Sequence, residues 1–143
     1  PFLSDWLFQM QLGWIEAYQR AGLRNVVEKP RITRLSLVKC GRDRWFDTLT
    51  VRLHATSLDY TITDAGELRA GSRDHERAFS EYWTLMRGVG VGGSARADKN
   101  CPNCGAPLDI TMAGECQYCR SRVTSGQFDW VLSRIEQDEV YRG

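Results

Sequence analysis

The chain has 143 residues, of which 42% are hydrophobic and 26% are charged, the profile of a globular protein in water. Its 19 basic and 18 acidic side chains give a net charge of +1, which gives no support for broad electrostatic attraction to nucleic acid or to an anionic membrane. No apolar run approaches the roughly 20 residues that cross a bilayer, and no signal peptide is present. The first residue is Pro1 and not Met, so we expect a piece of a longer protein.

The first predicted element is a helix over residues 4–20. Ser4 and Asp5 are suitable N-cap residues, because their side-chain oxygens can accept hydrogen bonds from free backbone N–H groups. Large apolar side chains recur at spacings of three and four, which predicts one apolar face: Trp6, Leu7, Met10, Trp14, Ile15 and Tyr18. Arg20 is the only clear basic residue on the polar face, so this helix is predicted to cover a sheet and not a membrane.

Antiparallel strands are predicted after the helix. Residues 23–30 are expected to be a connection. The strongest strand pattern is the alternation of apolar and polar residues over 45–58, which predicts a sheet covered on one face only. The other predicted strands are residues 31–40, a short one beginning at 68–70 and the aromatic stretch 77–87. One helix followed by such strands predicts an α+β fold. Four tryptophans are expected to pack in its core, with the lining of the concave face of the sheet as the alternative: Trp6, Trp14, Trp45 and Trp83.

Two Cys-x-x-Cys pairs, separated by eleven residues, are the most specific motif of the chain. They consist of Cys101, Cys104, Cys116 and Cys119. Four thiolates at this spacing can form a tetrahedral shell around Zn²⁺, and a closed shell of this kind is structural and not catalytic. Two disulfides or a thioredoxin-like redox pair are the alternatives. Arg120 and Arg122 lie beside the site and can offset its negative charge. The fifth cysteine, Cys40, is expected to be a small buried residue.

The sequence is predicted to divide into four parts. These are an α+β domain at residues 1–87, a Gly-rich linker at 88–100, a zinc ribbon at 101–124 and a C-terminal helix at 125–143. The helix is predicted from an apolar stripe at helical spacing, formed by Phe128, Val131, Leu132 and Ile135. Trp130 lies opposite that stripe. It is expected either to pack under the linker or on the first domain, or to anchor a partner together with Arg120 and Arg122.

Two stretches resemble a known family. Asp47–Arg52 followed by Asp59-Tyr60, and Phe79–Arg87, resemble the C-terminal domain of the mitochondrial inner-membrane translocase subunit 44. The Gly-rich linker and zinc ribbon resemble the tail of its bacterial members, although the helices that usually open the domain are missing. The resemblance covers residues 1 to about 87. It implies a nuclear transport factor 2-like fold, in which a curved antiparallel sheet forms a cone with an apolar pocket.

The resemblance implies a non-catalytic adaptor that is membrane-associated and linked to protein translocation or membrane-protein assembly. A protein partner or a membrane surface is expected, with an apolar ligand in the pocket and a homo-oligomer as further expectations. The implied location is the bacterial cytoplasm, either peripheral on the inner face of the membrane or anchored there through missing upstream sequence.

Two other classes of function remain open. The first is an isomerase-like or dehydratase-like enzyme that uses the cone pocket, with His54, Asp59 and Tyr60 as candidates. Strand alternation sends His54 and Asp59 to opposite faces, so the non-catalytic hypothesis is preferred. The second is nucleic-acid binding through the zinc ribbon. The basic residues near the ribbon are offset by acidic ones, which disfavours that class.

Overall fold

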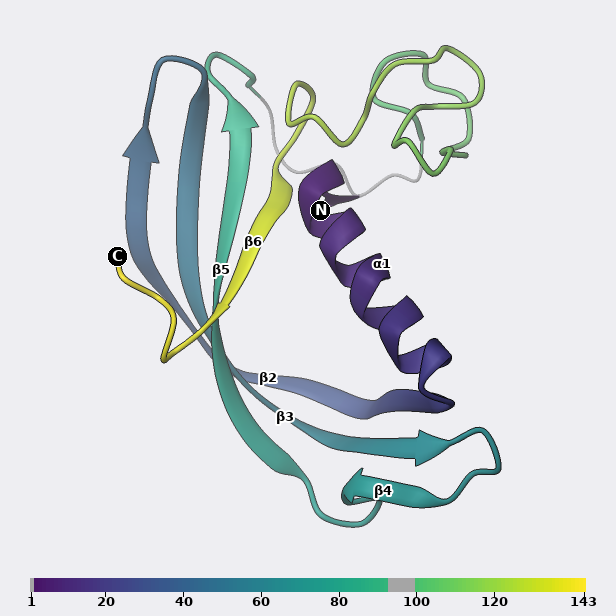
Figure 1. Ribbon diagram of the computed structural model, residues 1–143. Helices are drawn as coiled ribbons and strands as arrows, with labels where there is room; N and C mark the ends of the chain where they lie inside the picture. Colours follow the sequence, from purple (N-terminus) through teal and green to yellow (C-terminus); the bar gives the residue numbers. More distant parts are fainter. Residues whose placement is uncertain (1, 93–99) are drawn as a thin grey trace.

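The computed structural model describes residues 2–92 and 100–143, and within these ranges it contains one helix and six strands (Figure 1). The elements are β1 (Phe2–Leu3), α1 (Asp5–Arg20), β2 (Leu23–Arg42), β3 (Phe46–Thr63), β4 (Leu68–Gly71), β5 (Arg77–Gly88) and β6 (Val131–Gln137). Residues 93–99 of the predicted linker lie outside the described ranges. The α+β prediction is confirmed in its coarse form, although the fold is mostly sheet.

The strands form a single, strongly curved sheet in the order β1-β6-β5-β3-β2, and β4 pairs with the far end of β3. All the pairs are antiparallel except β1 with β6. The helix α1 lies on the inner side of the curve and leads from the β1–β6 edge toward the start of β2 (Figure 1). Residues of α1, β2, β3 and β5 line a cavity between the helix and the sheet.

The helix forms as its sequence predicts. Ser4 is the N-cap, and its side chain accepts a hydrogen bond from the backbone N–H of Leu7 at 3.4 Å. The helix ends at Arg20, where Gly22 adopts a φ of 65° that glycine tolerates well. Leu7 is the only residue of α1 that is buried. The apolar face of the helix is therefore mostly uncovered.

The long strand β2 begins earlier than predicted, at Leu23 and not at residue 31. Pro30 interrupts the strand pattern in the sequence, but a proline is tolerated on an edge strand and at a bulge. The pairing with β3 shifts register between Glu28 and Arg31, and Lys29 has a φ of 50° at this place. The bulge absorbs the proline, so the predicted connection at residues 23–30 is part of the strand.

The prediction of a C-terminal helix is wrong, because residues 131–137 form β6. Leu132 lies opposite Leu85, and Ile135 lies opposite Trp83. Leu85 and Trp83 are two residues apart on one strand, so Leu132 and Ile135 share a face of the sheet although three positions separate them. A register shift between these pairs inserts the extra residue. Because of this bulge, apolar residues on one face of a strand have the three-residue spacing that is typical of a helix.

Candidate functional site

The four cysteines of the two motifs come together in one cluster, and their sulfur atoms all lie within 4.8 Å of one another. The Cys101 and Cys119 sulfurs are 3.8 Å apart, and those of Cys104 and Cys116 are 4.0 Å apart. A disulfide needs about 2 Å, whereas a tetrahedral ion with metal–sulfur bonds of about 2.3 Å separates its ligands by about 3.8 Å. The geometry therefore fits a metal ion and not two disulfides.

The two cysteine turns have the same backbone geometry. Gly105 donates its N–H to the Cys101 carbonyl at 2.9 Å, and Arg120 donates to the Cys116 carbonyl at the same distance. The N–H of each first cysteine bonds to the carbonyl five residues later, at 2.7 Å for Cys101 and 3.0 Å for Cys116. Each turn thus holds two sulfurs toward a common centre. We call residues 100–124 the metal knuckle.

Hydrogen bonds and burial shift the pKa values of the cysteine thiols in different directions. The backbone N–H of Cys104 lowers the pKa of Cys101, and the Asn103 amide lowers the pKa of Cys119 to about 6. The N–H of Ala106 acts to lower the pKa of Cys104, but burial and the other cysteine sulfurs raise it to about 11. Four thiolates cannot share this space without a positive charge, so the cluster could hold a metal ion.

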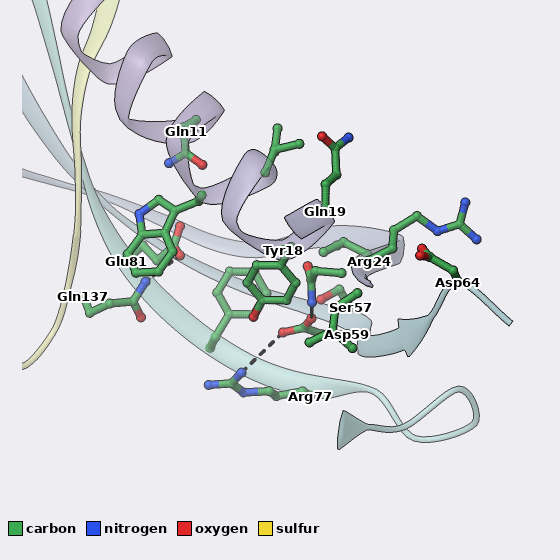
Figure 2. Close-up of a pocket in the computed structure, with 16 residues that line it drawn as sticks. Gln11, Tyr18, Gln19, Arg24, Ser57, Asp59, Asp64, Arg77, Glu81 and Gln137 are labelled. Carbon is green, nitrogen blue, oxygen red and sulfur yellow. Dashed lines mark hydrogen bonds and ion pairs between the residues drawn. The ribbon is translucent and has the colours of Figure 1, made fainter. Parts of the chain in front are cut away.

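A second site is a cavity of about 940 Å³ between α1 and the inner face of the sheet (Figure 2). Its apolar wall includes Trp14 and Ile15 of α1, with 62% and 54% of their surfaces exposed, and Val27 of β2. Large apolar side chains exposed around a hollow are typical of binding sites. The prediction that the tryptophans pack in the core is wrong for Trp14, and also for the exposed Trp6 and Trp45.

The floor of the cavity is polar. The Asp59 carboxylate accepts a hydrogen bond from the Asn25 amide at 3.0 Å and lies 3.3 Å from the Arg77 guanidinium (Figure 2). Ser57 lies next to them and is 1% exposed. Sequence reasoning missed Asn25 and Arg77. Only the pairing of β2 and β5 with the two sides of β3 places these side chains beside Asp59.

The three candidate catalytic residues are not brought together. Asp59 lines the cavity, but His54 lies opposite Ser80, on the outer face of the sheet. Tyr60 is 8% exposed and packs with Leu58 and Ile62, away from Asp59. The prediction that strand alternation separates His54 from Asp59 is confirmed. The cavity therefore contains only one of the three groups.

The three residues predicted to bind a partner have different surroundings. Trp130 is half-buried just before β6, where the Arg87 guanidinium lies 4.6 Å from its ring centre. Arg120 is exposed on the metal knuckle, and Arg122 pairs with Asp5 at 3.3 Å. Cys40 is exposed, so the prediction that it is buried is wrong; it lies on the edge strand β2, which no other strand covers in the described sheet.

A curved, mostly antiparallel sheet that forms a pocket with a helix fits the α+β class of nuclear transport factor 2-like folds. A family model described as the Tim44-like domain matches residues 1–96, which is more than half of the chain. The chain therefore belongs to the Tim44-like domain family, whose members are translocation-associated and generally not enzymes. No curated protein and no solved structure matches the chain.

The family is also membrane-associated, which suits a peripheral location. In residues 2–92 and 100–143, no helix has the length and apolar character needed to cross a membrane.

Proposed function

We propose that this chain is a non-catalytic binding module that holds an apolar segment of a protein partner between α1 and the curved sheet. The observation that carries the proposal is the cavity of about 940 Å³ with Trp14, Ile15 and Val27 exposed around it. Burying an exposed apolar side chain on a partner yields roughly 25 cal/mol for each Å² removed from water. Tryptophan is also the residue type most enriched at binding hot spots.

The polar floor supplies specificity to this proposed site. Arg77 can donate to a carbonyl or carboxylate of the partner, because 68% of its side-chain surface is exposed. Asp59 and Asn25 can exchange hydrogen bonds with backbone amides. A segment with apolar side chains on one side and free backbone groups on the other would satisfy both surfaces.

The test is site-specific photo-crosslinking in the native cells, with the photoreactive group at position 14. Trp45 is the matched control, since it is a tryptophan with 66% exposure that does not line the cavity. The proposal expects reproducible crosslinks to membrane-protein or translocase components from position 14 and far fewer from position 45. Equal yields from both positions would contradict it.

The same experiment tests the proposed location. Fractionation of the crosslinked cells should recover the chain on the cytoplasmic side of the bacterial inner membrane, held there by a partner or by the membrane surface. A chain that stays in the soluble fraction without crosslinks would remove the adaptor proposal. Attention would then turn to small molecules in the cavity and to chemistry at Asp59. Light scattering of the purified chain would show whether a homo-oligomer covers α1.

For the metal knuckle we propose a structural Zn²⁺ bound by Cys101, Cys104, Cys116 and Cys119. The support is the four-sulfur donor set at tetrahedral spacing, since zinc prefers closed thiolate shells in structural sites. Elemental analysis should find one zinc per chain, and Cys104→Ser with Cys119→Ser should abolish it. Another metal at full occupancy would overturn the choice of zinc. We also propose that Trp130, Arg120 and Arg122 contact a partner, which loss of partner capture by Trp130→Ala would support.

A further inference from the structure

The N-terminal residues of the chain are built into the metal knuckle. Phe2 packs against a small core formed by Cys101, Cys116 and Val123, all of which are at most 2% exposed. Two of the four proposed metal ligands are therefore also core residues beneath Phe2. The position of β1 depends on these cysteines, which a bound metal ion would hold in place.

A polar contact joins the knuckle to the first turn of α1. One oxygen of the Asp5 carboxylate accepts a hydrogen bond from the Thr124 hydroxyl at 2.7 Å, and the other lies 3.3 Å from Arg122. Thr124 is 7% exposed, so its hydrogen bond is partly buried, whereas the side chains of Asp5 and Arg122 are 43% and 54% exposed. We call Asp5, Arg122 and Thr124 the clasp. Two of its members, Arg122 and Thr124, follow the last cysteine, Cys119, by only a few residues.

The start of the helix is also held by the sheet. Phe2 pairs with Val131 and Leu3 pairs with Leu132 in the parallel β1–β6 contact. The N-cap residue Ser4 donates its backbone N–H to the Leu132 carbonyl at 2.8 Å. The knuckle, β6 and the first turn of α1 thus form one connected unit, although the knuckle and α1 lie at opposite ends of the sequence.

The rest of α1 is held mainly at its C-terminal end, where the chain continues into β2 and Gly22 accepts a backbone hydrogen bond from Asp64 at 3.1 Å. No residue of the helix after Leu7 is buried, and Trp14 and Ile15 face the open cavity. Trp14 lies eight residues before Gly22, which is about 12 Å along a helix axis. A swing of about 10° about this fixed C-terminal end would move Trp14 by about 2 Å and the first turn farther. The position of the first turn therefore affects the width of the cavity.

We propose that metal binding by the knuckle sets the position of α1 through the clasp and thereby regulates the cavity. Without the ion, the four cysteine side chains lose their common centre, and the core under Phe2 loosens. Arg122 and Thr124 then no longer hold Asp5. The first turn of α1 keeps only the β1–β6 pairing and the Ser4–Leu132 hydrogen bond, so it can swing away from the sheet about the C-terminal end of the helix. This inference rests on the proposed function, because it treats the cavity as the binding site.

Hydrogen exchange with mass spectrometry tests the coupling directly, on the whole chain with zinc and after removal of zinc by a chelator. Chelation is expected to speed exchange about tenfold in residues 100–124 and also in α1. The central strands β3 and β5 should keep their protection. The double variant Arg122→Gln with Thr124→Val should still bind one zinc, but its α1 should exchange rapidly even with zinc bound.

Arg120→Gln is the matched control for the clasp. It removes an arginine from the same knuckle, at a position without an acidic partner among the described residues. The hydrogen-exchange rate of α1 should therefore depend on zinc as it does in the unaltered chain. Three results would overturn the proposal. The first is a hydrogen-exchange rate in α1 that chelation does not change. The second is a loss of protection in β3 and β5 together with α1. The third is a double variant in which the exchange rate of α1 still depends on zinc.

The two proposals can fail separately. If position 14 crosslinks a partner equally well with and without zinc, the cavity binds a partner but the metal does not regulate it. If the hydrogen-exchange rate of α1 depends on zinc but position 14 crosslinks no partner, the metal controls the position of the helix and the proposed binding function fails.

Discussion

Gly105 and Arg120 occupy equivalent positions in the two cysteine turns, and both have a left-handed backbone, with φ of 75° and 61°. This conformation costs an ordinary L residue about 1–2 kcal/mol, whereas glycine adopts it freely. We therefore expect Arg120→Gly to stabilise the zinc-bound chain by about 0.5–1 kcal/mol, part of the gain being lost to the flexibility of glycine when unfolded. Chemical denaturation at a constant concentration of free zinc would measure this change in the unfolding free energy.

Two further variants separate backbone strain from charge at this position. Gly105→Ala should cost about 1 kcal/mol from its φ alone, because a Cβ there meets nothing within 4 Å. Arg120→Gln keeps the strained backbone and removes the charge. If Arg120→Gly and Arg120→Gln both destabilise the chain, the arginine charge beside the metal knuckle matters more than the strain.

Gly71 is the second position where glycine is required. It lies opposite Tyr60 with a φ of 78°, and a Cβ would collide with the Asp59 carbonyl oxygen and the Tyr60 backbone. We expect Gly71→Ala to cost about 3 kcal/mol, since it combines the φ strain with a clash that the β3–β4 pair must relieve. Gly66→Ala is the control, because its φ of 84° gives strain but its surroundings are open. Equal losses of unfolding free energy would show that the clash relaxes without cost.

Local patterns predicted those parts of the chain that local chemistry determines. The N-cap Ser4 and the cluster of four cysteines could be predicted in this way, because a cap and a Cys-x-x-Cys turn are each formed within a few residues. The predictions failed where pairing between distant strands determines the secondary structure or the burial of a residue. Leu132 and Ile135 have helical spacing only because a bulge lies between them. Trp14 has core composition but an exposed position, since neither sequence spacing nor hydrophobicity shows how much of a helix face a sheet covers.

The polar residues of the cavity could not be predicted from local sequence patterns either. Asn25 falls in a stretch predicted to be a connection, and Arg77 falls at the end of a predicted strand. Neither carries a motif. They approach Asp59 because β2 and β5 pair with opposite sides of β3, which requires the register of the whole sheet. Asp59 itself is a candidate in the sequence only through the enzyme alternative for the cone pocket, together with His54 and Tyr60.

The C-terminal segment should detach from the outer face of the sheet in acid. A hydrogen bond from Ser80, followed by one from Arg52 at 2.7 Å, holds the pKa of Asp138 below its usual value. A carboxyl whose pKa is lower when folded contributes stability above its unfolded pKa and loses it as the pH falls through the folded pKa. The Tyr82–Tyr141 stack, with ring centres 3.8 Å apart, should therefore weaken below about pH 4.

Aromatic NMR shifts of Tyr82 and Tyr141 would follow this change between pH 6 and pH 3. In Asp138→Asn the stack should already be weakened at pH 6 and should respond less to acid. Asp109→Asn is the control, because Asp109 accepts a hydrogen bond from Gln117 within the metal knuckle, away from the C-terminal segment. An Asp138→Asn chain with an unchanged stack would show that ring packing alone holds the segment.

Trp14 and Trp130 separate the two proposed partner surfaces. Trp14→Ala removes an exposed side chain, so we expect an unchanged unfolding free energy and a loss of partner capture in pull-downs. Trp130→Ala removes a half-buried ring beneath Arg87, so it should cost about 1–2 kcal/mol even if no partner touches it. Capture measured at saturating zinc and at a temperature where both variants are folded distinguishes the surfaces. Capture lost only with Trp130→Ala would move the binding site from the cavity to the metal knuckle and its neighbours Arg120 and Arg122.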